Sequence, residues 1–405
     1  MFRQLSPKQR WQFLLIIAVA FLYFASASMM LYFPKYIVDL GGNEQQAGWL
    51  SGVSLIPMLL FSLFIGSMSD KYGSKTLVMS GLILFSLSTY LQGYITDTGY
   101  ETFCLRFLQG MGHALVFSPL LAEVARIIPD GYRAAGIGYF TVSIQAGNTL
   151  GSSIGELCIK MWSYTSLFNI ATFIGLTALI ALFGIKSTKQ QPQNSSKQKI
   201  SDTQQTTALP NQYFGYLAVL LILGCSFGIA LQFMPIYFDF LLREELVQTP
   251  ISNLYFMTSC LMTVAMVRLF IGHHTDGIHR DKILKVCFVV MLFSLAALPF
   301  IRSEFASLLI SICFGLSYGL IFPSVNAQII EMVDADKRGK SSGILAVVYE
   351  VGFRGMPVLA GSLVFYIGYT QMFYTLCVAF GLSILFLLYT KRKDKNAISK
   401  PPLTV

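Results

Sequence analysis

Residues 66 to 75 read GSMSDKYGSK, a stretch in which Gly66 and Gly73 flank the charged pair Asp70 and Lys71. It lies between two apolar runs of about 20 residues, the length that crosses roughly 30 Å of hydrocarbon. A shorter copy, GHHTD, occupies residues 272–276. Because glycine lets the backbone turn tightly and helices approach closely, the stretch predicts a short connection between two membrane-spanning helices. Its repetition predicts a duplicated fold.

Similar apolar runs recur along the whole chain. Of its 405 residues, 54% are hydrophobic and 12% are charged, and the mean hydropathy is +0.62; soluble proteins carry about 25% charge. The first run starts at Trp11 and has no cleavage-like end, so we expect an uncleaved helix. The sequence predicts an all-α membrane protein with twelve transmembrane helices. We expect them near 11–38, 46–69, 75–95, 102–128, 134–158, 163–185, 213–240, 250–272, 283–301, 304–330, 341–367 and 369–390.

The repeats divide the chain into two related halves. RAAG at 133–136 corresponds to KSSG at 340–343, and FPKY at 33–36 corresponds to MPIY at 234–237. Between the halves, residues 187–212 are almost free of large apolar side chains and cannot pack a core. We predict two pseudo-symmetric six-helix bundles, at 1–186 and 213–405, joined by a flexible cytoplasmic linker at 187–212, with a short basic cytoplasmic tail at the end.

Basic residues are distributed unevenly over the predicted loops. If the N-terminus is cytoplasmic, most of the 29 Lys and Arg residues fall on the cytoplasmic side, and only Lys35, Lys160, Arg243 and Arg302 face outside. This is the positive-inside pattern, so we expect both termini in the cytoplasm and no nucleic-acid partner for the net charge of +9. The seven cysteines show no CxxC or Cys/His ligand spacing, so we expect no disulfide framework, no metal site and no cofactor.

The stretch at 66–75 resembles the G-x-x-x-D-[RK]-x-G-[RK]-[RK] motif of the major facilitator superfamily, with Ser74 where that family usually has a second basic residue. The resemblance implies the major facilitator fold, alternating access, and a loop that latches the halves. Glu123 and Glu331, at matching helix ends, look like the acids that pair with such loops; the alternatives are a simple tight turn and solvated acids. The residues that the resemblance assigns to the loops and their gating are Gly66, Asp70, Lys71, Gly73, Lys75, Gly272, Asp276, Glu123 and Glu331.

Two further motifs lie inside spans. Arg106 to Gly110 is similar to the family's R-x-x-x-G motif, which implies a role in proton coupling or substrate contact; the alternative is an arginine that snorkels to the outer surface. Gly138, Gly147, Gly151 and Gly155 reproduce the spacing of the family's antiporter motif, although Ser152 and Glu156 replace its proline and last glycine. The glycines at four-residue steps also predict a flat face for close helix packing. The motif therefore favours export only modestly.

Ionisable residues inside apolar spans are candidate proton carriers or substrate contacts. Glu350 and Arg354 are four residues apart with the acid first, which suits an ion pair that is either structural or part of a gate. His113 shares a helix face with Arg106, and an imidazole titrates near neutral pH; the alternative is a histidine that only packs among helices. Glu156 is a third protonatable candidate, and we expect Arg268 to snorkel.

Aromatic and polar residues on the spans that form the family's central cavity are candidates for lining the substrate site. They are Tyr32, Tyr36, Phe117, Gln232, Tyr237, Tyr318 and Asn326.

The pattern is closest to the drug or metabolite:proton antiporters of this family, so the first hypothesis is proton-coupled efflux of a small drug-like compound or metabolite. Uptake of a sugar or organic anion, and export of a siderophore or other metabolite, are alternatives, and a transporter-like sensor without flux is a different class. We expect no enzyme, because no nucleophile and base pair or phosphate-cradling loop stands out. The expected partners are the substrate, protons and the lipid bilayer. We expect a monomer in the cytoplasmic (inner) membrane.

Overall fold

The computed structural model describes residues 5–129, 132–185, 209–270, 280–333 and 338–398, and these ranges are helical, without strands. The first part of the chain contains α1 Pro7–Met29, α2 Phe33–Asp39, α3 Glu44–Gly52, α4 Leu55–Tyr72, α5 Ser74–Gln92, α6 Tyr100–Ile127, α7 Arg133–Met161 and α8 Tyr164–Phe183. The second part contains α9 Asn211–Gln232, α10 Met234–Arg243, α11 Asn253–Phe270, α12 Arg280–Ala297, α13 Glu304–Glu331, α14 Arg338–Ile367 and α15 Tyr369–Ile398.

Nine helical segments within the described residues are long and apolar enough to cross a membrane, and each matches an expected span. The other three expected spans, 46–69, 102–128 and 134–158, are also helical, as α3 with α4, α6 and α7. These three carry more polar residues, among them Arg106, Gln109 and His113. Of the expected linker, the structure describes residues 209–212, and α9 begins within them at Asn211.

The duplicated FPKY and MPIY stretches interrupt the first span of each half. Pro34 and Pro235 occupy the first turns of α2 and α10, where the missing N–H and fixed φ of proline are tolerated. Each proline therefore lies in the first turn of a short second helix that continues the span. Between α4 and α5, Gly73 has a φ of 83°, a left-handed conformation that glycine adopts without strain.

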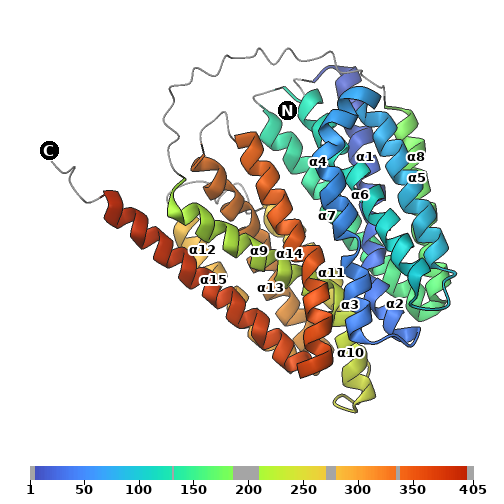
Figure 1. Cartoon of the computed structure of the whole chain (residues 1–405), viewed down its shortest axis with the longest axis vertical. Helices are drawn as coiled ribbons and strands as arrows, with labels where there is room; N and C mark the ends of the chain where they lie inside the picture. Colours follow the sequence, from blue (N-terminus) through green and yellow to red (C-terminus); the bar gives the residue numbers. More distant parts are fainter. Residues whose placement is uncertain (1–4, 130–131, 186–208, 271–279, 334–337, 399–405) are drawn as a thin grey trace.

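The helices form two groups that meet at one end (Figure 1). Helices α1 to α8 pack mainly on one another, and so do α9 to α15. The groups contact each other chiefly through α3 with α14 and α7 with α11. In Figure 1 the start of α1 and the end of α15 lie at the upper end, where the groups diverge, and α3 and α10 lie at the lower end. We call the lower end, which includes Asp39, Arg243 and Tyr369, the distal end.

Glycines allow the backbones to touch at these contacts. A Cβ at Gly48 of α3 would lie 2.3 Å from the carbonyl oxygen of Pro357, and one at Gly361 of α14 would lie 2.2 Å from the carbonyl oxygen of Glu44. Contacts this short leave no room for a side chain. The α3–α14 contact is therefore a backbone-to-backbone contact between the two groups.

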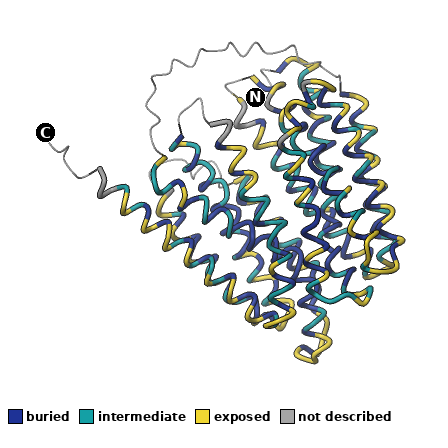
Figure 2. The backbone as a smooth tube through the Cα atoms, viewed as in Figure 1, coloured by how far each residue is buried: buried dark blue, intermediate teal, exposed yellow. Residues whose placement is uncertain are grey.

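The outer surface is apolar. Figure 2 shows that exposed residues lie along the outward sides of the helices and buried residues lie between them. Large apolar side chains such as Phe173, Ile180 and Phe293 are about 70% exposed, at 70%, 73% and 68%. Soluble monomers rarely expose apolar patches of this extent. The surface fits a multi-pass membrane protein whose helices face lipid.

Candidate functional site

Two ion pairs connect the helix groups at the distal end. Lys35 Nζ of α2 lies 2.5 Å from Asp239 Oδ2 of α10, and Arg243 Nη2 of α10 lies 2.9 Å from Asp39 Oδ1 of α2. Each helix contributes one cation and one anion, so the pairing is reciprocal. We call these four residues the α2–α10 clasp. Lys35 and Arg243 are two of the four basic residues that the charge pattern places on the outer side.

Further hydrogen bonds close the same end. Tyr369 donates to Glu44 Oε1 over 3.2 Å, and the Asn253 amide donates to the Tyr32 hydroxyl over 3.3 Å. Lys160 donates to Ser252. Each of these bonds joins a residue of the first helix group to one of the second. The distal end is therefore held shut by polar contacts as well as by the glycine contact of α3 and α14.

A cavity of about 480 Å³ lies between the two groups. Its wall includes residues of α1, α6, α7, α9, α11, α13 and α14, and it extends from Arg106 to Leu121 and Ile330, toward the end where the groups diverge. Cavities of this size hold drug-sized molecules. The cavity is therefore large enough for a small solute and is closed off from the distal end.

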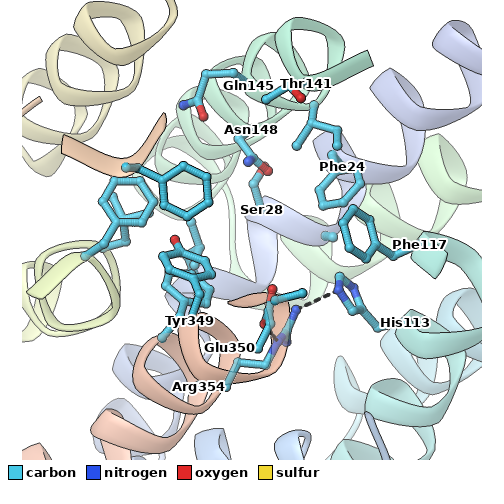
Figure 3. A pocket seen from close by; sticks show the side chains of 18 of the residues that line it. Phe24, Ser28, His113, Phe117, Thr141, Gln145, Asn148, Tyr349, Glu350 and Arg354 are labelled. Atoms are coloured by element: carbon cyan, nitrogen blue, oxygen red, sulfur yellow. Dashed lines mark hydrogen bonds and ion pairs between the residues drawn. The ribbon is translucent and has the colours of Figure 1, made fainter. Parts of the chain in front are cut away.

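A chain of polar contacts crosses the cavity wall from one helix group to the other (Figure 3). The Tyr23 hydroxyl lies 2.6 Å from His113 Nδ1, and Arg354 Nη2 lies 3.0 Å from His113 Nε2. Arg354 Nε donates to Glu350 Oε2 over 2.9 Å. Tyr23 and His113 belong to α1 and α6, whereas Glu350 and Arg354 belong to α14. We call these four residues the relay.

The hydrogen-bonding partners of His113 determine its protonation state in this arrangement. A guanidinium group only donates hydrogen bonds, so Nε2 must accept one and carries no proton. The neutral imidazole then carries its proton on Nδ1 and donates it to the Tyr23 oxygen. A second proton, on Nε2, would point an N–H at the N–H of Arg354. Protonation of His113 therefore breaks its contact between the two helix groups.

Arg106 is buried, with only 5% of its surface exposed, and is held by other contacts. It donates to Gln109 and to the backbone carbonyls of Leu50 and Ser51 at the end of α3, over 3.4 and 3.3 Å. Its guanidinium carbon lies 4.1 Å from the centre of the Phe33 ring. Arg106 thus joins α6 to the carboxyl end of α3, where a positive charge is favourable.

Arg268 lies in the cavity wall. The sequence predicts instead that its side chain snorkels to the membrane surface. Its guanidinium carbon lies 5.7 Å from the centre of the Tyr318 ring and 5.3 Å from that of Phe322. The two rings belong to a patch of aromatic side chains contributed by α9, α13 and α14. We call this patch the aromatic wall, and it consists of Phe227, Tyr318, Phe322, Tyr349 and Phe353.

The opposite part of the cavity carries neutral polar groups that sequence reasoning did not single out. Thr141, Gln145 and Asn148 of α7 line it, and Figure 3 shows them apart from the relay. They are spaced at four and three residues and so share one helix face. That stripe of polar residues in an apolar span was visible in the sequence. Tyr23 gave no comparable indication, because nothing local distinguishes it from a packed tyrosine.

The predicted cavity residues fall into two sets. The first set lines the cavity and consists of Phe117, Gln232, Tyr318 and Asn326. The same wall includes Arg106 and three residues of the relay, His113, Glu350 and Arg354. Tyr32, Tyr36 and Tyr237 are instead buried between helices, where their hydroxyls donate to the carbonyls of Ser152, Ile95 and Pro299. These three hydroxyls fix their helices to neighbouring segments of the chain.

Glu156 lies outside the cavity lining. It is 7% exposed, and its Oε1 lies 3.4 Å from Lys160 Nζ, one turn further along α7. The nearby glycines of α7 lie against α1 and the helical turn that follows it: a Cβ at Gly147, Gly151 or Gly155 would meet the Phe21 carbonyl, the Ala25 carbonyl or the Tyr32 ring within 2.9 Å. In this structure the glycine spacing serves close packing of α7 on α1.

The loop motif is only partly described. Gly66 faces open space, Lys71 is exposed near the Tyr72 ring, and Lys75 Nζ donates to the carbonyls of Phe183 and Ile185 at the end of α8. The side chain of Asp70 and residues Gly272 and Asp276 lie outside the described residues. Of the two helix-end acids, Glu123 is buried and pairs with Arg126, and Glu331 is exposed.

Comparison with known proteins agrees with this architecture. The sequence model of the Major Facilitator Superfamily matches residues 15–354 and 308–404. Multidrug resistance protein 1 of Bacillus subtilis (strain 168) is 23% identical over 353 residues, covering 87% of this chain and 89% of that protein. The sialic acid transporter NanX of Escherichia coli (strain K12) is 25% identical over 403 residues, covering 96% and 95%. The crystal structure of a bacterial homolog to the human lysosomal transporter Spinster, inward-facing and occupied, matches with a TM-score of 0.73 at 12% identity, covering 96% and 98%.

Proposed function

Because the chain belongs to the major facilitator superfamily, we propose that it is a secondary transporter in which the relay couples proton movement to the transport of a small solute through the cavity. The observation that carries this proposal is the contact between His113 and Arg354, which joins the two helix groups and exists only while His113 Nε2 carries no proton. A proton therefore changes the contact between the parts that must move against each other in alternating access.

The proposed orientation places both termini in the cytoplasm, as the distribution of Lys and Arg favours. The distal end is then the outer side, and the α2–α10 clasp closes it. The cavity reaches toward the cytoplasmic side, so this conformation receives solute from the cytoplasm. We propose that the chain acts as a monomer and not as an enzyme, in the cytoplasmic membrane.

The proposed direction is export. The similarity to multidrug resistance protein 1 extends over most of both chains and favours export. The glycine spacing of α7, which resembles the antiporter motif, also favours export. In this cycle a proton entering from outside binds the relay after the solute has left, and the groups then return to the conformation described here. The membrane proton gradient supplies the free energy, and the relay transmits its effect to the contact between the groups.

Import of an anionic nutrient is the second candidate. It is favoured by the three arginines of the cavity wall and by the similarity to a protein named for sialic acid transport. A negatively charged solute bound near the relay favours its protonated form, so the relay can also take up a proton together with an anionic solute. The two candidates differ in the sign of proton movement when solute is added.

The test uses everted membrane vesicles whose interior is acidified by respiration and reported by a quenching dye. Aromatic acids, lipophilic cations and sugars are added to vesicles that carry wild type, His113→Gln, Glu350→Gln or the control Arg392→Gln, which changes an exposed arginine of α15. Export by antiport predicts proton release on addition of one solute class, in wild type and control only.

Solute uptake without proton movement in wild type would indicate uniport and would refute coupling. Proton release that is unchanged in both relay variants would refute the role of the relay. Proton movement of the opposite sign would replace export by import.

A further inference from the structure

The charge of the cavity wall is unbalanced. Among the described residues that line it, the charged side chains are Arg106, Arg268, Arg354 and Glu350. Three guanidinium groups face one carboxylate, which leaves a net charge of +2 while His113 is neutral. A positive, largely apolar cavity concentrates anions and repels cations, because water screens little of its field.

Arg106 does not account for this imbalance by itself. Its donors are directed to Gln109 and to two backbone carbonyls of α3, and one face of its guanidinium covers the Phe33 ring. These contacts hold Arg106 in place without neutralising it. The two arginines that remain, Arg268 and Arg354, belong to the second helix group.

In the part of the chain that the structure describes, Arg268 has aromatic contacts and no anionic partner. Its guanidinium lies against the Tyr318 and Phe322 rings, its Nε is buried without a hydrogen-bond partner, and no acid of the described residues forms an ion pair with it. Buried guanidinium nitrogens are normally satisfied. A guanidinium stacked on rings keeps its edge donors available for a carboxylate or a similar group. Among the described residues, Arg268 therefore has the properties of an anion-binding residue without an anionic protein ligand.

Arg354 is only partly engaged by the acid beside it. Its Nε contacts one oxygen of Glu350, and one terminal nitrogen contacts His113, so the forked, two-point geometry that arginine makes with an anion is not used. Both partners of the ion pair are about one-fifth exposed to the cavity, at 20% and 21%. A second anionic group can therefore reach Arg354 and compete with Glu350.

The aromatic wall connects the two arginines. The Tyr318 and Tyr349 hydroxyls are 2.6 Å apart, and Tyr318 stacks on Phe227 with ring centres 3.9 Å apart and planes at 4°. Arg268 lies on Tyr318, and Tyr349 directly precedes Glu350 in α14. Stacked flat rings of this kind favour a planar apolar partner.

We propose that the transported solute is an amphipathic organic anion, with an acidic group bound by Arg268 and Arg354 and a planar apolar body packed on the aromatic wall. This inference rests on the proposed function, since it assigns the substrate class of that same cavity. Glu350 occupies Arg354 while the cavity is empty, and the acidic group of the solute takes its place. The neutral polar residues of α7 face the rest of the solute.

The test measures binding by equilibrium dialysis, with purified protein in nanodiscs of phosphatidylcholine, so that no anionic lipid competes. The ligands are three matched triads with naphthyl, indolyl or phenyl rings, each as the carboxylate, the amide and the methylammonium form. We expect at least one carboxylate to bind about tenfold or more tightly than its amide, as one charge-assisted contact suggests, and the ammonium to bind least. Adding phosphatidylglycerol to the nanodiscs tests whether an anionic lipid occupies the same site, because a lipid ligand would displace the carboxylate.

Two variants with opposite expected effects keep the result independent of folding. Arg268→Gln should lower carboxylate affinity about tenfold and leave amide binding unchanged. Glu350→Gln should raise carboxylate affinity several-fold, because it removes the competing acid from Arg354. The control Arg392→Gln removes a positive charge outside the cavity and should change neither.

The inference is overturned if no carboxylate binds better than its amide in any triad, or if phosphatidylglycerol alone displaces every acid. It is also overturned if Glu350→Gln weakens carboxylate binding. Selective carboxylate binding without proton movement in vesicles would leave this inference intact and refute proton coupling. Proton-coupled movement of a cation, with no preference for acids in binding, would support proton coupling and refute this inference.

Discussion

Reversing one charge of the α2–α10 clasp should open the distal end. Asp239→Lys replaces the partner of Lys35 with a like charge. The two side chains are 18% and 32% exposed, so solvent weakens the native pair, and we take its contribution as about 1 kcal/mol. Two like charges about 4 Å apart repel by about 1 kcal/mol even in water, so the substituted lysine opposes the contact by a similar amount. The total of about 2 kcal/mol corresponds to a roughly 30-fold shift of the equilibrium toward the distal-open conformation.

Double electron–electron resonance measures this shift. Spin labels at Thr96→Cys and Gln248→Cys report the distance between exposed distal positions of the two groups, after the three partly exposed cysteines are replaced by serine. We expect one short distance in the parent protein and a new, longer distance in Asp239→Lys. The additional change Lys35→Asp restores an ion pair with exchanged charges and should restore the short distance.

The matched control is Glu244→Lys, which makes the same change of charge at an exposed distal residue outside the clasp. It should leave the distance unchanged. The reasoning is refuted if the double variant Lys35→Asp/Asp239→Lys keeps the longer distance, or if Glu244→Lys lengthens the distance equally. Either result would mean that the distal conformation does not depend on the clasp.

Three other predictions concern single residues. Gly48→Ala should block the distal-closed conformation, because a Cβ would lie 2.3 Å from a carbonyl of α14; the same spin-label distances should lengthen, and Gly138→Ala, which faces open space, should leave them unchanged. Lys75→Met removes the donor to the last carbonyls of α8 and should destabilise the protein by about 1 kcal/mol, seen as a lower Tm; an unchanged Tm would contradict that role. Arg106→Lys keeps the charge but loses the fork that spans two carbonyls of α3, so transport in vesicles should fall about tenfold; full activity at normal membrane level would contradict it.

The fold was largely predictable because lipid constrains the sequence directly. Long apolar runs and the distribution of Lys and Arg are local properties, and they identify the helices one by one. The breaks at Pro34 and Pro235 were harder to recognise, although proline causes both. Hydropathy does not detect a break between two helices that leaves the run equally apolar.

The candidate site was predictable in its parts and not in its connections. Arg106, His113, Glu350 and Arg354 stand out as ionisable residues in apolar runs, which are rarely there without a role. The contact of His113 with Arg354 joins positions 241 residues apart, so no local pattern indicates it. For the same reason the aromatic contacts of Arg268 were not foreseen, since Tyr318 lies on another helix.

The reciprocal arrangement of the clasp has a consequence for synthesis and membrane insertion. Asp39 and Arg243 are 204 residues apart, and at about 5–20 residues per second the ribosome needs roughly 10–40 s to make the second after the first. Meanwhile Lys35 and Asp39, four residues apart on α2, can pair with each other, as Asp239 and Arg243 later can on α10. With the distal end on the outer side, as proposed above, each segment can thus cross the bilayer as a nearly neutral unit, and the charges exchange partners only after the second half has been inserted.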